Sequence, residues 1–191
     1  MEHKQFPSAT EVEQELKRER YKRRYRRTLK STIFALVTAA AAAVLVATLW
    51  LPVLQIFGSS MTPTLQEGQI VASVKADEME PGDIIAFYYG NKVLIKRYIA
   101  GPGVWVDIRE DGTILLNGEV LEEPYLTEKA FGICDLELPY QVPEGTYFLV
   151  GDHRESSVDS RHSSVGCIAE DQIVGKIIFR VWPMDTFGPV K

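Results

Sequence analysis

An uncharged apolar run from Ile33 to Leu51 constrains the fold of this chain more than any other feature. A helix of these residues would be roughly 29 Å long at about 1.5 Å rise per residue, which matches the hydrocarbon core of a bilayer. A cleavable export signal has a shorter apolar stretch, of about 7 to 15 residues. The run therefore predicts one membrane-spanning helix, placed within residues 31–57.

Charge is divided unevenly between the two sides of this run. Residues 1–30 contain ten Lys or Arg and five Glu, which gives +5, so residues 31–191 carry −10 for a net charge of −5. The basic tract Lys17–Lys30 adjoins the apolar run, which is typical of a segment that meets anionic lipid rather than nucleic acid. Because positive charge marks the cytoplasmic side, residues 1–30 are expected in the cytoplasm and residues 58–191 outside the cell membrane.

Residues 58–191 have the pattern of one mainly β domain. Asp111-Gly112 and Asn117-Gly118 bracket a short apolar segment, which is a strong hairpin signal. Evenly spaced short strands predict a sandwich or barrel-like fold, whereas the weak strand signals of residues 122–144 predict an extended loop. Gly, Pro and Asp separate the clearest expected strands, which are residues 70–74, 83–89, 93–99 and 146–150.

The cysteines and histidines do not indicate a metal site. Cys134 and Cys167 are the two cysteines of the chain, and they fit a disulfide in an oxidising exterior or a pair of free thiols equally well. The histidines have no ligand spacing with either thiol, and a structural zinc site usually has four ligands. No metal and no cofactor are predicted.

Ser60 and Lys96 are the candidates for a catalytic pair. Ser60 precedes Pro63, whose fixed φ stiffens the segment, although Gly58-Ser59-Ser60 can also be read as a simple turn. Lys96 and Arg97 stand in an apolar strand with alternating faces, so one of the two should point into the domain. A buried lysine has a lowered pKa and can accept the proton of a serine hydroxyl. A surface lysine that reaches into water is the alternative reading.

A polar loop, Gly151 to Arg161, follows the expected strand 146–150. Its composition fits a solvated loop. Its carboxylate and guanidinium groups can also form planar ion pairs that hold a loop rigid beside a reacting centre. These charged residues are Asp152, Arg154, Asp159 and Arg161.

Taken in order, these segments resemble the type I signal peptidases, the membrane-bound serine–lysine proteases that remove export signals. The resemblance covers about residues 30–183 and implies a β-rich peptidase fold after one transmembrane helix. It rests on five motifs, which are Ser60–Leu65, Pro81–Phe87, Lys96-Arg97 with Pro102-Gly103, Gly151–Arg161, and Ile173–Lys176.

The resemblance also implies catalytic and supporting roles. Ser60 would be the acylated nucleophile and Lys96 its general base. Ser157 would bond the lysine amine, and an ion pair of Asp159 with Arg161 would support it. Arg97, Asp152 and Arg154 would be structural.

Two further implied roles concern the substrate. Met61 and Ile95 would line shallow apolar pockets for small side chains at the first and third positions before the cut. The backbone N–H of Ser60 would form part of the oxyanion hole. Gly58 stands where some members place a second donor, a hydroxyl, which matches the single-span, Gram-positive-like branch.

The implied activity is removal of signal peptides from exported preproteins after Ala-x-Ala-like sites, through an acyl-enzyme. The implied partners are preproteins, membrane lipid and the protein-export translocase, with no nucleic acid. A self-cleaving Ser/Lys regulator of the repressor type is one alternative, but such proteins are soluble and carry a DNA-binding part. A membrane-anchored β domain that binds exported chains without cutting them is the other.

Overall fold

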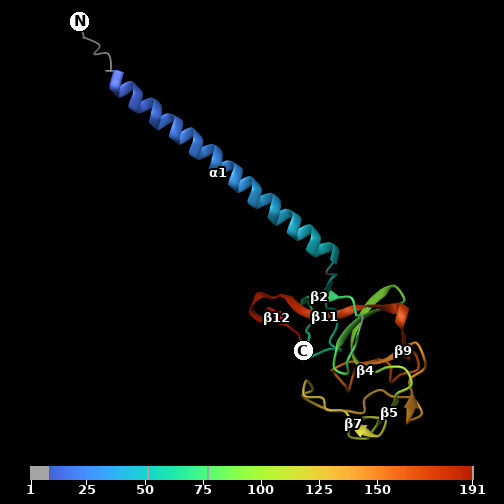
Figure 1. Cartoon of the computed structure of the whole chain (residues 1–191). Coiled ribbons are helices and arrows are strands. Elements are labelled where there is room, and N and C mark those ends of the chain that lie inside the picture. Colours follow the sequence, from blue (N-terminus) through green and yellow to red (C-terminus); the bar gives the residue numbers. More distant parts are fainter. Residues whose placement is uncertain (1–8, 51, 77, 191) are drawn as a thin grey trace. The chain divides into compact units, whose positions relative to one another are not determined.

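The structure, a computed structural model, describes residues 9–50, 52–76 and 78–190. It separates into two compact units, Met1–Leu49 and Trp50–Lys191. Helix α1 (Ala9–Trp50) makes up most of the first unit, and all of the labelled strands belong to the second (Figure 1).

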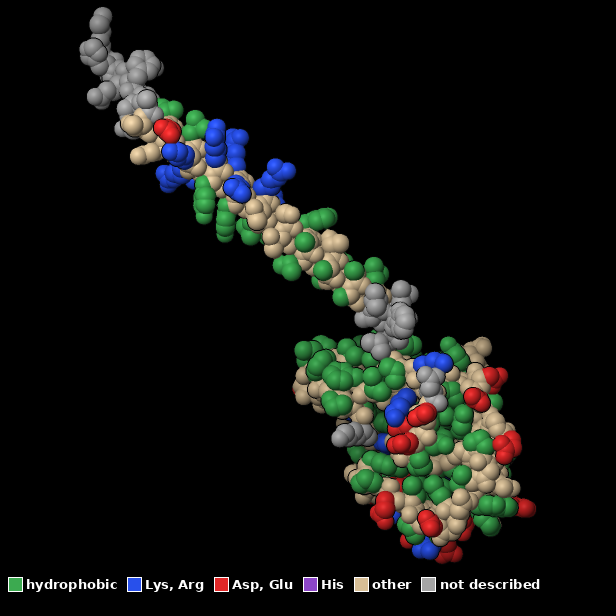
Figure 2. All heavy atoms as spheres, in the orientation of Figure 1, with side chains coloured by type: hydrophobic (Ala, Val, Ile, Leu, Met, Phe, Trp, Pro, Cys, Tyr) green, Lys and Arg blue, Asp and Glu red, His purple; other side chains and the backbone are tan. Residues whose placement is uncertain are grey.

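Helix α1 combines a basic half with an apolar half. It has 42 residues, which corresponds to about 63 Å at 1.5 Å per residue. Lys and Arg side chains gather along its N-terminal part and hydrophobic side chains along the rest (Figure 2). The portion Val12–Leu45 includes a stretch long and apolar enough to cross a membrane. Its described side chains are exposed, as expected of a helix whose solvent is lipid.

The boundaries of α1 correct the helix expected over residues 31–57. The helix extends through the basic tract because strong helix formers dominate there, with ion pairs such as Lys17 to Glu13 at 2.9 Å. It ends at Trp50, two residues before Pro52, which cannot continue a helix. Residues 53–55 form strand β1 and pair with β2, so they belong to the β-rich unit.

The β-rich unit contains two antiparallel sheets in its described residues (Figure 1). The larger, eight-stranded sheet has the order β1-β2-β11-β3-β4-β9-β10 with β12 beside β11, and the smaller has the order β7-β6-β5-β8. Strands of the larger sheet are β1 (Val53–Gln55), β2 (Ile70–Val74), β3 (Ile84–Tyr89), β4 (Lys92–Ala100), β9 (Thr146–Val150), β10 (Ile168–Ala169), β11 (Ile173–Trp182) and β12 (Gly188–Pro189). Those of the smaller sheet are β5 (Trp105–Ile108), β6 (Ile114–Leu116), β7 (Glu119–Val120) and β8 (Tyr140–Gln141), and the short 3-10 helices are η1 (Glu170–Gln172) and η2 (Met184–Thr186).

The mainly β, sandwich or barrel-like fold predicted from the sequence is confirmed. The expected hairpin joins β6 to β7 through Asn117 and Gly118, whose φ values of 52° and 87° suit a tight hairpin turn. Residues 122–144 form an extended excursion in which β8 is the one strand that the structure describes. Cys134 and Cys167 are free thiols, so of the two readings left open, the free pair is the one present.

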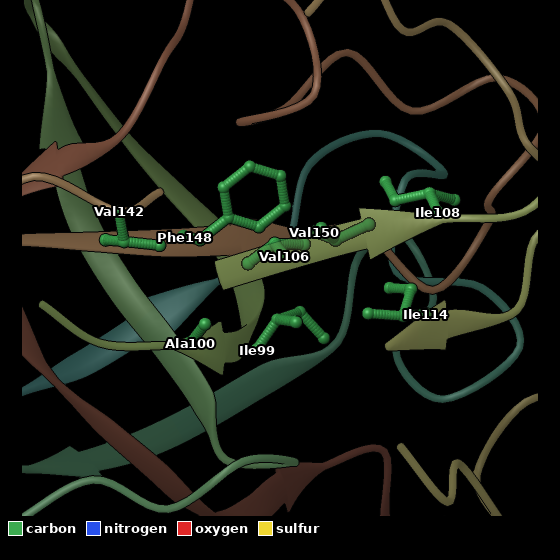
Figure 3. Close-up of a cluster of buried hydrophobic side chains, with 8 residues drawn as sticks. All are labelled: Ile99, Ala100, Val106, Ile108, Ile114, Val142, Phe148 and Val150. Carbon is green, nitrogen blue, oxygen red and sulfur yellow. The ribbon is translucent and has the colours of Figure 1, made fainter. Parts of the chain in front are cut away.

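Both faces of the larger sheet are covered. On β3, Ile84 and Ala86 join one buried cluster while Ile85 and Phe87 join another, which is the two-residue period of a strand buried on both sides. A third cluster joins β4 and β9 to the smaller sheet (Figure 3). Its members are Ile99, Ala100, Val106, Ile108, Ile114, Val142, Phe148 and Val150.

Candidate active site

Ser60 lies in the connection between β1 and β2, on a segment fixed by packing and backbone hydrogen bonds. Its neighbour Met61 is 2% exposed and packs in the same cluster as Leu65. The Thr62 N–H donates to the Ser59 carbonyl at 3.0 Å, and the His153 N–H donates to the Ser60 carbonyl at 3.0 Å. The backbone that carries the Ser60 hydroxyl is therefore held from both sides.

Lys96 is a buried amine. Its side chain stands on β4, and the residue is 4% exposed. Burial lowers the pKa of Lys96 from 10.5 to about 8, against the opposing effect of the Asp159 carboxylate. Its Nζ donates a hydrogen bond to Ser157 Oγ at 2.9 Å, as the resemblance implied. With that pKa the amine is neutral in about one copy in ten at pH 7, against roughly one in 2500 for an ordinary lysine.

Arg97, the next residue, is also buried, which corrects the expectation that only one of the pair points into the domain. Lys96 lies opposite Ile85 of β3 and Arg97 opposite Ile84, and these two isoleucines belong to different clusters. The two side chains thus leave opposite faces as expected, but both faces are covered. Arg97 donates two hydrogen bonds to Asp152, at 2.8 and 2.6 Å.

Gly151 brings Ser60 and the lysine amine into one corner. A Cβ at Gly151 would clash with Ser157 Oγ and would lie 2.6 Å from the Ser60 carbonyl oxygen. Lys96 Nζ donates its hydrogen bond to the same Ser157 Oγ. The Ser60 backbone and the group that holds the Lys96 amine therefore both lie against Gly151. Among the described residues no hydrogen bond joins Ser60 Oγ to Lys96 Nζ. Hydrogen bonds between a nucleophile and its base are often long without substrate and shorten in the substrate complex.

All four charged residues of the loop Gly151–Arg161 form ion pairs, but only Asp159 and Arg161 pair within the loop, whereas Asp152 and Arg154 pair with residues outside it. Arg161 donates to both carboxylate oxygens of Asp159 at 2.9 Å, and Asp159 also accepts the Gly151 N–H at 2.9 Å. Arg161 further donates to the carbonyls of Phe131 and Arg154 at 2.9 Å. These bonds satisfy a buried charge pair and fix the loop that carries Ser157.

Sequence reasoning missed two residues of the buried network, Glu123 and Tyr125. Both terminal nitrogens of Arg154 donate hydrogen bonds to the Glu123 carboxylate. Glu123 also accepts a hydrogen bond from the Tyr125 hydroxyl at 3.0 Å. The Tyr125 ring lies 3.7 Å from the Arg97 guanidinium carbon. Both residues come from the excursion 122–144, where strand periodicity is weak, and no local pattern could have paired them with the loop.

An apolar cavity of about 700 Å³ adjoins Ser60. Met61 and Ile95, the residues expected to contact substrate, line it together with Gly58, which has a φ of 80°. Its remaining lining comes from β1 and the following residues and from the first half of β4, namely Val53, Leu54, Gln55, Ile56, Phe57, Lys92, Val93 and Leu94. The cavity is large enough for several small side chains.

One side of this cavity is a strand edge. The Tyr98 N–H of β4 donates to the Asp83 carbonyl at 2.7 Å, and N–H directions alternate along a strand. Ile95 and Val93 therefore direct their backbone groups away from β3, and β9 pairs with β4 only from Arg97 onward. The edge beside Ser60 is thus open to another strand.

No group of three or more His, Cys, Asp or Glu that could hold a metal ion occurs in the part of the chain that the structure describes. The charged groups near Ser60 are instead satisfied by one another. Arg97 pairs with Asp152, Arg154 with Glu123, and Arg161 with Asp159. Besides these ion pairs, the site contains the Ser60 hydroxyl and the buried Lys96 amine.

Comparison with known proteins places the chain in a family. The family described as "Signal peptidase, peptidase S26" matches residues 29–182. Signal peptidase IB of Staphylococcus aureus is 38% identical over 152 residues, covering 69% of this chain and 78% of that protein. Signal peptidase I T of Bacillus subtilis is 35% identical over 147 residues, covering 70% and 75%. The crystal structure of a signal peptidase I from Enterococcus faecalis has a TM-score of 0.45 and 30% identity, covering 52% of this chain and 97% of that one. This chain therefore belongs to the type I signal peptidases of peptidase family S26, a family of serine peptidases.

Proposed function

We propose that the chain removes N-terminal signal peptides from exported preproteins, with Ser60 as nucleophile and Lys96 as general base. The observation that carries this proposal is the buried Lys96 amine, held at 2.9 Å by Ser157 Oγ in the corner where Gly151 contacts the Ser60 segment. A serine hydroxyl becomes a useful nucleophile when a positioned base takes its proton. An amine with a pKa near 8 is suited to that role near neutral pH.

In the acylation step, Ser60 Oγ attacks the carbonyl carbon of the scissile peptide bond and its proton moves to Lys96 Nζ. The carbonyl oxygen becomes an oxyanion, for which the Ser60 N–H is one donor. That N–H donates no hydrogen bond to another described residue, so it is available. The protonated amine then gives its proton to the leaving nitrogen as the C–N bond breaks, which releases the mature protein.

In the deacylation step, Lys96 takes a proton from a water molecule that attacks the ester carbonyl. The C–O bond to Ser60 breaks, and the proton returns to Ser60 Oγ. The signal peptide leaves with a new carboxylate. One neutral amine thus acts as base in each half-reaction and is neutral again at the end of each.

The apolar cavity is the proposed site for the signal-peptide side of the cut. Its open edge at Val93 and Ile95 can add a substrate strand through main-chain hydrogen bonds. Met61 and Ile95 line the space that would receive the first and third side chains before the cut. Their bulk favours small substrate side chains, which supports an Ala-x-Ala-like preference.

Membrane lipid is the second proposed partner. Helix α1 carries basic residues before its apolar part, a pattern that favours an N-terminus in the cytoplasm and a β-rich unit outside. That unit also exposes large apolar side chains near η2, including Trp182, Met184 and Phe187 at 53%, 69% and 54%. Exposed apolar groups of this kind support contact with the outer membrane surface, where preproteins arrive.

The test is cleavage of a purified preprotein by the full-length protein in liposomes, with sequencing of the product N-terminus. Wild type is expected to cut after a small-x-small site. Ser60→Ala and Lys96→Ala are expected to lose cleavage by at least about a thousandfold, since both halves of a catalytic pair are needed. Ser59→Ala, at the exposed serine next to the nucleophile, is the matched control and should cut like wild type.

The other outcomes are equally informative. If folded wild type does not cut, that result favours the alternative of a membrane-anchored domain that binds exported chains without processing them. Activity that survives in Lys96→Ala would mean that a different group is the base. Cutting after large residues would contradict the proposed use of the apolar cavity.

A further inference from the structure

A second, polar cavity lies beside Ser60. It has a volume of about 300 Å³ and shares no lining residue with the apolar cavity. Met61 lines the apolar cavity and Thr62 lines the polar one, so consecutive residues after Ser60 face different spaces. His153, which also lines the polar cavity, donates its N–H to the Ser60 carbonyl. Both cavities are therefore within two residues of the same hydroxyl.

The walls of the polar cavity are fixed by buried contacts on each side of the segment Thr127–Ala130. Before that segment, Glu123 binds Arg154, and Tyr125 stacks on Arg97. After it, the Phe131 carbonyl accepts a hydrogen bond from Arg161. Gly132 then packs so closely that a Cβ there would clash with the Arg154 carbonyl. Buried contacts on both sides thus hold residues 127–130 in place, so the cavity is a fixed part of the fold.

A substrate cut at Ser60 has residues on both sides of the scissile bond. Under the proposed function, the residues before the cut occupy the apolar cavity, so those after it must leave Ser60 by another path. The polar cavity is open to solvent, begins at Thr62 and suits a hydrophilic chain. We propose that it binds the first residues of the mature protein, about the second to fourth after the cut. This inference rests on the proposed function and deepens it.

The charge of the cavity predicts which mature residues it favours. Its buried charges are neutralised, since Asp152 pairs with Arg97 and Arg154 with Glu123. Glu128 and Glu155 are exposed in its lining, and within the described residues neither forms an ion pair. His153, the remaining titratable group of the lining, is exposed. The cavity therefore carries negative charge near neutral pH and should favour Lys over Asp after the cut.

The experiment measures kcat/KM of the full-length protein in detergent micelles on preproteins with Lys, Gln or Asp at the second to fourth mature positions. For wild type, the Lys substrate should exceed the Asp substrate by about two- to fivefold at low ionic strength. The double variant Glu128→Gln/Glu155→Gln should bring that ratio close to one, and Glu128→Lys/Glu155→Lys should invert it. The control Glu110→Gln/Glu119→Gln changes two exposed glutamates, one in the β5–β6 connection and one on strand β7, and it should keep the wild-type ratio.

A direct readout uses Ser60→Ala protein, which holds substrate without cutting it. A photo-crosslinker at the third mature residue should label residues 127–130. The same probe three residues before the cut should label residues 53–57 or 92–95.

The proposal is overturned if wild type and all variants cleave the preproteins with the same ratio of kcat/KM between the Lys and Asp substrates. It is also overturned if the crosslinker at the third mature residue labels the apolar cavity. Either result leaves the proposed function standing. If wild type cuts none of the three preproteins, the proposed function itself fails, and this inference fails with it.

Discussion

At the scale of single residues, the state of the Lys96 amine decides what this site can do. In the proposed mechanism the neutral amine of Lys96 is the base, and the fraction of neutral amine grows as pH rises. With a pKa of about 8, that fraction increases about tenfold between pH 7 and pH 9. We therefore expect kcat/KM for a preprotein to rise about tenfold over this range and to level off above it, measured with full-length protein in detergent.

Two variants sharpen this prediction. Ser157→Ala removes the acceptor that orients the amine, so kcat should fall while KM changes little. The control for Ser157→Ala is Ser164→Ala, which changes an exposed serine just after the loop Gly151–Arg161. A midpoint near pH 6.5 would point to a histidine as the base, and a profile that is flat from pH 6 to 9 would contradict a titrating base altogether.

At the scale of elements, the excursion 122–144 is fastened to the loop Gly151–Arg161, and we call the contact between Glu123 and Arg154 the clamp. Glu123 and Arg154 are both buried, and their ion pair joins the two segments. Glu123→Ala would leave the Arg154 guanidinium buried without its carboxylate, which costs about 3–5 kcal/mol. We expect a matching fall in the free energy of unfolding, measured by denaturant titration in detergent, together with weaker cleavage.

The neighbouring residue supplies the control for this clamp. Glu122→Ala changes an exposed glutamate and should alter stability by less than about 0.5 kcal/mol. The double variant Glu123→Leu/Arg154→Met replaces the ion pair by apolar groups and should recover much of the lost stability. Equal stability of Glu122→Ala and Glu123→Ala would rule out a structural role for the clamp.

At the scale of the whole molecule, we propose that the distribution of charge along α1 sets the orientation in the membrane. Lys and Arg lie before the apolar part, and positive charge is retained on the cytoplasmic side. Replacing the basic residues of 17–30 by Gln, and inserting a Lys-rich segment after Pro52, should move the β-rich unit into the cytoplasm. Protease added to the outside of intact spheroplasts should digest that unit in wild type and spare it in the variant.

Acidic residues supply a control because they contribute little to orientation. Glu13→Gln/Glu15→Gln/Glu19→Gln should leave the accessibility pattern unchanged. If the recharged variant is digested like wild type, something other than the charge asymmetry orients this protein.

Much of this molecule follows from local sequence pattern. Alternating apolar residues predict β2, β3, β4 and β9, and Asn117-Gly118 predicts the β6–β7 hairpin, because strand faces and tight turns depend on neighbours in the chain. The apolar run predicts a spanning helix for the same reason. Motif order alone singles out Ser60 and Lys96 as candidates and names the family to which the chain belongs.

The tertiary structure decided what depends on residues far apart in the chain. It paired β2 with β11 and covered both faces of β4, which buried Arg97 as well as Lys96 and lowered the lysine pKa. It brought Glu123 to Arg154 across 31 residues. It also turned residues 53–55 from the end of an expected helix into an edge strand. Sequence pattern reports local periodicity, whereas burial and ion pairing depend on which distant surfaces meet, and packing alone determines that.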